Sequence, residues 1–344
     1  MDDKITLVLN GEAEQNDRKE AESEDMKKLT SVVAPIADKY QIQGPALYVV
    51  YDDNIQGEDG TVWGGEFLLG DREQELTIHY VKEPDDSGEN LHAVPMHDEL
   101  EKAESEPEVA EKSGRLIRMG CLQPVQLLGS RDEARNAQMV FACMMNDAED
   151  RGLIWEDYES DQILDPNLHQ TIAIALDAGI DTYVSTSLLR LFDAAAAVLG
   201  ICEENTYPGE CAKKLLEAAH NAVNKWNNGT FGMASHQIDV LKNRFPVRMI
   251  LEKKDGEWIA DGPRLIGDLR MARDGGIPAD ELALEFHDAV AEMTVKMCGN
   301  IAADASENGI RVNRVVLSGE IFGDDILKER TIKGLQDKGY QVCY

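Results

Sequence analysis

The residues of this chain that could do chemistry are scattered rather than gathered in one catalytic motif. Three hydroxyl side chains stand together at positions 185–187, but no His–Asp signature accompanies them, so nucleophilic catalysis of the Ser–His–Asp kind is not indicated. His92 and His97, followed by two acids, could at most form an adventitious metal site. His287 adjoins an apolar helical stripe, which favours a hydrogen-bonded structural histidine. These residues alone predict no particular reaction.

The cysteines are widely separated, and the chain contains no C-x-x-C pair. Such spacing encodes neither a disulfide framework nor a structural zinc site. Several of the cysteines have apolar neighbours in the sequence, so we expect buried, reduced thiols. They are Cys121, Cys143, Cys202, Cys211, Cys298 and Cys343.

The composition is strongly acidic, with 65 Asp and Glu against 34 Lys and Arg and a formal net charge of −31. A surface of this sign repels a phosphate backbone, so we expect no nucleic-acid partner. No stretch approaches the roughly 18 apolar residues that a membrane helix needs, and the first residues do not resemble a signal peptide, so we expect no membrane partner and a cytoplasmic location. Acidic clusters at 12–25 and 98–111 could dock a basic protein, although solvated faces or insertions are favoured.

Apolar periodicity in the first third of the chain predicts a helix followed by strands. One face of residues 23–40 is apolar at helical spacing. Apolar strands at 46–51 and 61–69 flank a turn rich in Gly, Asp and Asn, which is typical of a hairpin. Residues 76–81 could extend the hairpin to a meander. The polar segment 82–114, rich in Pro and Glu, is interpreted as an insertion.

The remainder is predominantly helical from 131 to 245, and it ends as strand, loop, helix and strand between 314 and 343. A small hairpin around 247–260 precedes a helix at 279–306, whose apolar residues form a continuous stripe. Strands near both ends with helices between them predict an α/β layer fold.

Five segments, in the same order and at similar spacing, resemble the Kae1-like domain of the HypF carbamoyltransferase family. Residues 59–71, DGTVWGGEFLLGD, are similar to the family pattern D-G-T-x-W-G-G-E-F-L-x-x-D. Residues 118–129 resemble its R-x-x-x-L-x-P-x-x-L-x-G loop, and 185–197 resemble T-S-S-x-G-R-L-F-D-A-x-A-A-x. Residues 278–292 resemble P-x-x-x-x-x-x-F-H-x-x-x-A-E, and 314–324 resemble R-V-x-L-S-G-G-V-F-Q-N.

The resemblance implies an actin/sugar-kinase-like fold of two lobes. Such proteins bind a nucleotide between the lobes and transfer a carbamoyl group from carbamoyl-adenylate to a cysteine thiolate of a partner protein. By this resemblance we expect residues 45–344 to form a Kae1-like lobe, with the insertion and the helical region as additions. Residues 1–44 would then be the remnant of an incomplete first lobe. The resemblance also assigns ten candidates for a nucleotide or carbamoyl pocket: Asp52, Thr61, Gly64, Gly65, Glu66, Arg190, Asp193, Ser318, Gly319 and Asp324.

Several positions depart from the family at the expected cleft. Where the family has two imidazoles one helical turn apart, residues 28–32 contain no histidine, so we expect no metal site and regard Asp52 as the only retained candidate ligand. The following loop has lost most glycines that let backbone N–H groups approach a phosphate, and Asp53 adds repulsion. Glu320 and Asp324 replace a glycine and an asparagine, and acids there oppose a polyanion.

Three functions remain open at this point. The first is a catalytically degenerate relative that acts as a binding or scaffold protein without a cofactor. Its partner would be a protein, either the hydrogenase-maturation machinery or a subunit that supplies the missing lobe. The alternative is a working carbamoyltransferase completed by such a subunit, which would use ATP or carbamoyl-adenylate and a divalent metal. The third is a phosphate-sensing regulator that binds nucleotide without turnover.

Overall fold

The computed structural model describes residues 27–82, 108–129, 136–153, 166–229 and 235–344. The start of the predicted first helix and most of the predicted acidic insertion, with His92 and His97, lie outside these residues. No helix in the described part of the chain is long and apolar enough to cross a membrane.

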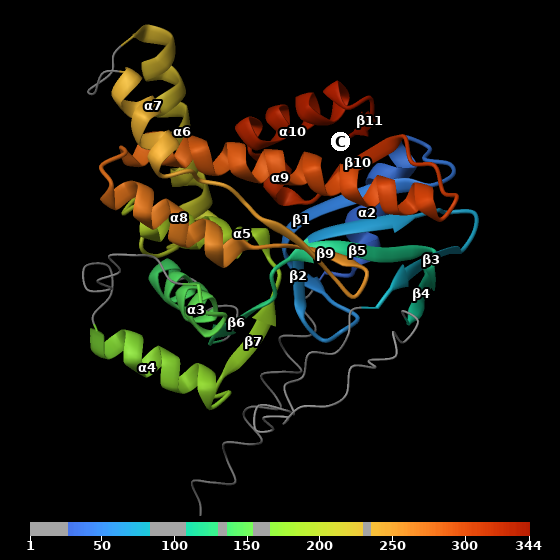
Figure 1. Cartoon of the computed structure of the whole chain (residues 1–344), viewed down its shortest axis with the longest axis horizontal. Coiled ribbons are helices and arrows are strands. Elements are labelled where there is room, and N and C mark those ends of the chain that lie inside the picture. Colours follow the sequence, from blue (N-terminus) through green and yellow to red (C-terminus); the bar gives the residue numbers. More distant parts are fainter. Residues whose placement is uncertain (1–26, 83–107, 130–135, 154–165, 230–234) are drawn as a thin grey trace, which may run out of the picture.

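Within the described residues, nine strands form one mixed sheet. They are β1 (Ala46–Gln56), β2 (Val62–Gly70), β5 (Leu116–Leu122), β6 (Val125–Leu128), β7 (Thr182–Ser185), β8 (Leu251–Lys254), β9 (Glu257–Ala260), β10 (Arg314–Ser318) and β11 (Gln341–Cys343). The order is β11-β10-β1-β2-β5-β9-β8, and β7 joins β6 to β2. β1 is parallel to β10 and antiparallel to β2, so the chain's last strands lie beside one of its first (Figure 1).

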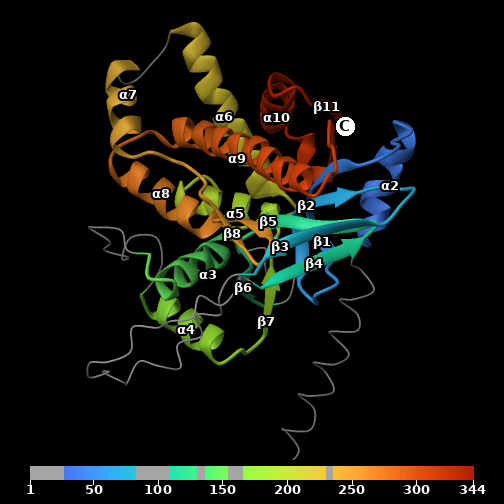
Figure 2. The ribbon, with the colours of Figure 1, turned by 45° about the vertical axis from the view of Figure 1, so that its right-hand side comes forward.

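Helices cover both faces of the sheet. They are α2 (Leu29–Lys39), α3 (Ala137–Asp150), α4 (Pro166–Asp177), α5 (Leu188–Val198), α6 (Glu210–Asn228), α7 (Ser235–Arg244), α8 (Gly262–Asp274), α9 (Ala279–Glu307) and α10 (Asp325–Asp337). The long helix α9 packs between α6 and α10 over one face, and α2 packs on β1 and β10 (Figures 1 and 2).

The side chains of β1 alternate between two hydrophobic cores, because successive residues of a strand point to opposite faces. Leu47, Val49 and Tyr51 belong to the large core under α5 and α9, and Tyr48 and Val50 belong to the small core under α2. All five are buried, which explains why this strand is almost continuously apolar in the sequence.

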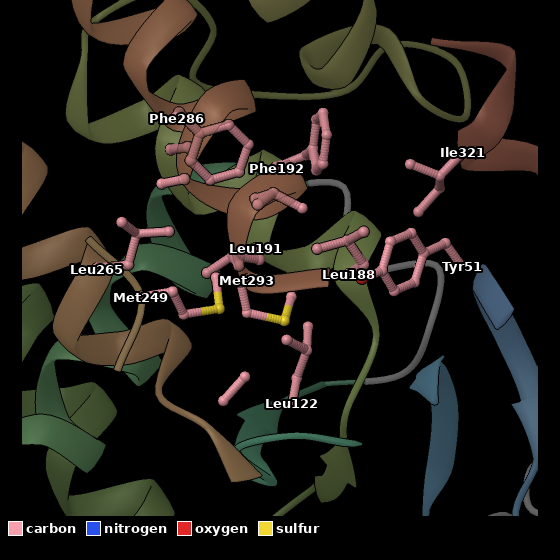
Figure 3. Close-up of a cluster of buried hydrophobic side chains, with 14 of the residues drawn as sticks. Tyr51, Leu122, Leu188, Leu191, Phe192, Met249, Leu265, Phe286, Met293 and Ile321 are labelled. Atoms are coloured by element: carbon pink, nitrogen blue, oxygen red, sulfur yellow. The ribbon is translucent and has the colours of Figure 1, made fainter. Parts of the chain in front are cut away.

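Aromatic and sulfur-containing side chains fill the large core where the helices meet the sheet (Figure 3). Phe192 of α5 and Phe286 of α9 meet edge to face, with 4.9 Å between ring centroids. Tyr51 stacks on Phe322 at 4.9 Å and its hydroxyl is hydrogen-bonded to Thr294. These contacts lock α5, α9 and the 3₁₀ turn Glu320–Gly323 against the end of β1.

The predicted hairpin of β1 and β2 is confirmed, but its turn is shorter than expected. β1 continues to Gln56 beyond a register shift between Tyr51 and Ile55, so the residues after Asp52 are strand rather than turn. The backbone of Lys27 explains the difference, because it exchanges hydrogen bonds with Asn54 and Gln56 and keeps them extended.

The predicted meander is wrong. Residues 76–81 form β3 (Leu76–Val81), which pairs with β4 (Val109–Gly114) in a separate two-stranded sheet. β2 could not accept β3 because β5 already occupies that edge. β4 also shows that the end of the predicted insertion is an ordered strand.

The helical predictions are confirmed in type, with shifted ends. In the described residues α2 begins at Leu29, α3 begins at Ala137 and α6 continues to Asn228. The region predicted as helical also contains β7, a short strand of four residues that was not foreseen. Its partner strand β6 was missed as well, because short segments carry little periodic signal.

Candidate functional site

Asp52, the retained candidate metal ligand, is paired with a cation of the chain itself. Its side chain is 2% exposed at the end of β1. The Lys27 ammonium donates to Asp52 Oδ1 at 2.8 Å and to Glu320 Oε1 at 2.7 Å. Burial opposes the charge of this lysine, but the hydrogen bonds to both carboxylates outweigh it and raise the pKa of Lys27. An ammonium therefore lies between the two carboxylates.

The donor set around Asp52 does not fit the metal that the family resemblance implies. Among the described residues no group of three or more His, Cys, Asp or Glu side chains is placed to hold an ion. The position beside Asp52 that a cation would take is filled by the ammonium of Lys27, and Asp53 N–H donates to the same Oδ1 atom at 2.9 Å. No chemical step is therefore assigned to a metal here.

The predicted glycines of β2 lie close to the backbone of neighbouring segments. A Cβ atom on Gly64 would lie 2.1 Å from the carbonyl oxygen of Asp52, and one on Gly65 would lie 2.5 Å from that of Thr186. These distances are too short for any side chain, so the glycines let β2 approach its neighbours. Thr61 lies in the preceding turn, where its N–H and hydroxyl donate to Asp59.

Glu66 is a carboxyl group inside the core. It is 0% exposed, and its Oε1 accepts from the Thr186 hydroxyl and, at 3.3 Å, from Gly64 N–H. Its Oε2 has no hydrogen-bond partner in the described structure. Burial raises the pKa of Glu66 to about 7, despite the hydrogen bond from Thr186 and the nearby charge of Arg118.

Arg190 and Asp193 form an ion pair within the fold. Arg190 Nη1 lies 3.0 Å from Asp193 Oδ2, with 14% and 0% of the side chains exposed. Asn205 Nδ2 donates to Asp193 Oδ1 at 3.0 Å, and Cys211 N–H donates to Asn205 Oδ1 at 2.8 Å. Burial raises the pKa of Asp193 and the guanidinium opposes that shift. Asn205 thus connects this buried pair of α5 to the start of α6.

Ser318 and Gly319 lie at the end of β10, where both contact neighbouring elements. The Ser318 hydroxyl donates to the carbonyl oxygen of Val32 at 2.6 Å and so ties β10 to α2. Gly319 has φ +104°, and a Cβ there would lie 2.0 Å from the carbonyl oxygen of Tyr51. Only glycine suits this close, left-handed turn.

Asp324 caps α10 and holds a buried histidine. Its Oδ1 accepts from Leu327 N–H at 2.8 Å, and its Oδ2 lies 2.9 Å from Nε2 of His287. Nδ1 of the same ring lies 2.6 Å from the carbonyl oxygen of Ala283. The histidine is 0% exposed and hydrogen-bonded on both sides, as expected for a structural residue.

Two substitutions of Asp324 should separate its role as the cap of α10 from its contact with His287. Asp324→Ala removes the cap and the histidine contact, so we expect a loss of about 1–2 kcal/mol in the free energy of unfolding. Asp324→Asn should cost less, because asparagine caps equally well and its amide can form a hydrogen bond with Nε2 of His287. Urea denaturation of both variants measures the difference, and equal losses would contradict it.

A pocket lies next to Asp324, between the starts of α5 and α6 and the 3₁₀ turn Glu320–Gly323. Its volume is about 300 Å³. The walls are mainly apolar, and the ionisable residues are three acids and one lysine. The lining consists of Asp53, Leu189, Phe192, Pro208, Gly209, Ala212, Lys213, Leu216, Glu320, Ile321, Gly323 and Asp324.

A family model described as "Carbamoyltransferase, Kae1-like Domain, second subdomain", of the HypF type, matches residues 109–344. The chain belongs to this HypF family. The carbamoyltransferase HypF of Rhodobacter capsulatus is 30% identical over 184 residues, which are 51% of this chain and 18% of that protein. A HypF homolog of Cupriavidus necator is 24% identical over 312 residues, covering 90% of this chain and 63% of the homolog.

Two solved HypF structures share the fold. Full-length HypF in its phosphate- and nucleotide-bound form superposes with a TM-score of 0.62 at 20% identity, over 90% of this chain and 32% of that one. HypF of T. kodakarensis superposes with a TM-score of 0.58 at 17% identity, over 90% of this chain and 32% of that one. The α/β, Kae1-like fold expected from the sequence is thus confirmed. The chain spans less than two thirds of the length of these relatives.

Of the ten residues predicted from the HypF resemblance, only Asp324 lines the pocket. Asp53 and Glu320, which the sequence singled out as departures from the HypF pattern, do line it. Sequence reasoning missed Lys27 and the apolar wall from α6. The i, i+4 spacing of Ala212 and Leu216 was a signal for that wall, but nothing local linked Lys27 to Asp52.

Proposed function

We propose that this HypF-family chain is a binding or scaffold protein whose cleft no longer transfers a carbamoyl group. The observation that carries the proposal is the ammonium of Lys27 between Asp52 and Glu320. In carbamoyl transfer a cation or a donor set must grip the phosphate and stabilise charge on the reacting oxygen. Here the ammonium of Lys27 is shared by both carboxylates, so the cluster keeps a net negative charge and its one cation is already bound.

The pocket supports the same proposal. Asp53, Glu320 and Asp324 stand at its lining with Lys213 as the single base among the lining residues. Three carboxylates near a polyphosphate would raise its energy by Coulomb repulsion. The other lining residues from α5 and α6, Leu189, Phe192, Ala212 and Leu216, have apolar side chains. A neutral or apolar group suits this pocket better than a nucleotide does.

The partner in this proposal is a protein, such as hydrogenase-maturation machinery. The formal net charge of −31 favours a basic surface on that partner, because opposite charges steer two proteins together.

Thermal unfolding with ligands tests the proposal. A ligand that binds the folded state stabilises it by about 2.7 kcal/mol at a hundredfold excess over its Kd. We expect millimolar ATP with Mg²⁺, or carbamoyl phosphate, to leave the melting temperature unchanged. We also expect no carbamoyl-adenylate-dependent transfer to a thiol acceptor. A raised melting temperature together with transfer would refute the proposal.

The retained pocket favours one second candidate, a carbamoyltransferase completed by a separate subunit. Its closeness to the end of β1 leaves room for a substrate group near Asp52. On this reading ATP with Mg²⁺ should raise the melting temperature of the chain, and Asp52→Asn should abolish the rise. An unchanged melting temperature in the native chain removes this candidate.

A further inference from the structure

Two Asn-Gly pairs lie at the ends of helices in the described part of the chain, and their backbones are alike. Asn228 and Gly229 end α6, and Asn308 and Gly309 end α9. Both glycines are left-handed, with φ of 63° and 77°, and each donates its N–H to a carbonyl oxygen of the preceding turn. Asparagine deamidates most readily before glycine, because glycine has no side chain to obstruct attack by its own backbone nitrogen. A third pair, at 10–11, lies outside the described residues.

The side chain of Asn308 is held in place. Its Oδ1 accepts from the backbone N–H of His79 at 2.8 Å. Its Nδ2 donates to the carbonyl oxygens of His79 at 3.3 Å and Asp304 at 3.0 Å. These bonds tie the end of α9 to β3, so the carboxamide loses all of them if it turns toward Gly309.

Asn228 has no such restraint. Its side chain is exposed, and its carboxamide makes no hydrogen bond within the described residues. It lines an open pocket of about 530 Å³ between α6 and the start of α9, together with Lys225 and Asp280, which form an ion pair. The last turn of a helix frays, so the carboxamide and the backbone nitrogen of Gly229 can meet.

We propose that Asn228 is a site of spontaneous deamidation. The backbone nitrogen of Gly229 attacks Cγ of Asn228 and closes a succinimide ring. The proton of that nitrogen passes through solvent to the side-chain nitrogen, which leaves as ammonia. Water then opens the ring at either carbonyl and gives aspartate or isoaspartate. The net reaction consumes one water and releases one ammonia, and it needs no oxidant or reductant.

The product carboxylate changes the charge of the pocket. It competes with Asp280 for the ammonium of Lys225. A negative charge is also unfavourable at the C-terminal end of a helix, where the helix dipole is negative. Deamidation should therefore loosen the end of α6 from α9 and lower the melting temperature by about 1–4 °C. The inference stands independently of the proposed function.

Peptide mapping of the aged chain tests the proposal. The folded full chain is kept at pH 8 and physiological temperature, digested at acidic pH and analysed by mass spectrometry, and isoaspartate is detected with an isoaspartyl methyltransferase. We expect Asn308 to react at least about tenfold more slowly than Asn228, because its three hydrogen bonds must open first. In urea these bonds are lost, so the two sites should react at similar rates.

Two variants complete the test. Asn228→Gln keeps a carboxamide but would have to close a larger ring, so this position should stay intact over the same period. Asn228→Asp carries the charge of the product and should reproduce the fall in melting temperature. Equal rates at Asn228 and Asn308 in the folded chain overturn the proposal. So does an Asn228 that stays intact in the folded chain while it reacts in urea.

Discussion

Lys27→Met should destabilise the fold by about 2–3 kcal/mol and make it respond to divalent cations. The substitution keeps an unbranched side chain of similar length. It leaves Asp52, whose side chain is 2% exposed, without its cation. Breaking a fully buried ion pair costs about 3–5 kcal/mol. The loss here should be smaller, because 32% of the Lys27 side chain is exposed and Glu320 is largely in water.

In the variant, Asp52 and Glu320 are free to bind Mg²⁺ or Mn²⁺, so millimolar cation should restore part of the lost stability. Urea denaturation with and without the cation measures both effects. The matched control is Lys28→Met, which removes an exposed ammonium one residue away and should change stability by less than about 0.5 kcal/mol. Equal stability of the Lys27 and Lys28 variants would show that the ammonium does not neutralise Asp52.

Glu66→Gln should stabilise the protein by up to about 3 kcal/mol above pH 7. The pKa of Glu66 rises from 4.5 to about 7 in the fold, and each unit corresponds to about 1.4 kcal/mol. A raised carboxyl pKa means that the folded state holds the proton more tightly than the unfolded state does. The contribution of Glu66 to the free energy of unfolding is therefore most favourable below pH 4.5. It falls between pH 4.5 and about 7 and is constant at higher pH.

Glutamine keeps the oxygen that accepts from Thr186 and Gly64, but it cannot ionise. The stability of the variant should therefore not fall between pH 4.5 and 7 on account of this side chain. Chemical denaturation at pH 4.5, 6 and 8 gives the comparison, and the difference from the native chain should grow with pH. Glu217→Gln on the exposed side of α6 is the control and should leave the pH dependence unchanged. A constant difference at all three pH values would contradict ionisation of a buried Glu66.

The sequence alone predicts the helices and hairpins whose apolar residues repeat regularly along a short stretch of chain. Leu282, Phe286, Val290 and Met297 recur at helical spacing, and all are buried along α9. The hairpin of β1 and β2 could be predicted for the same reason, since its strands are neighbours in the chain. The HypF segments were recognisable because close packing constrains residues such as Gly64 and Gly319 at single positions.

Which charged residues of the site form ion pairs, and which of them are buried, follows from the tertiary structure. Lys27 meets Glu320 across 293 residues, and their contact depends on the parallel pairing of β1 with β10. Whether Arg190 and Asp193 were exposed or buried likewise depended on how α6 packs against α5. Periodicity reports which face of an element is apolar, whereas an ion pair depends on which elements become neighbours. That choice is made by the whole core, so the acids of the cleft could be listed from the sequence, whereas their cation, Lys27, could not.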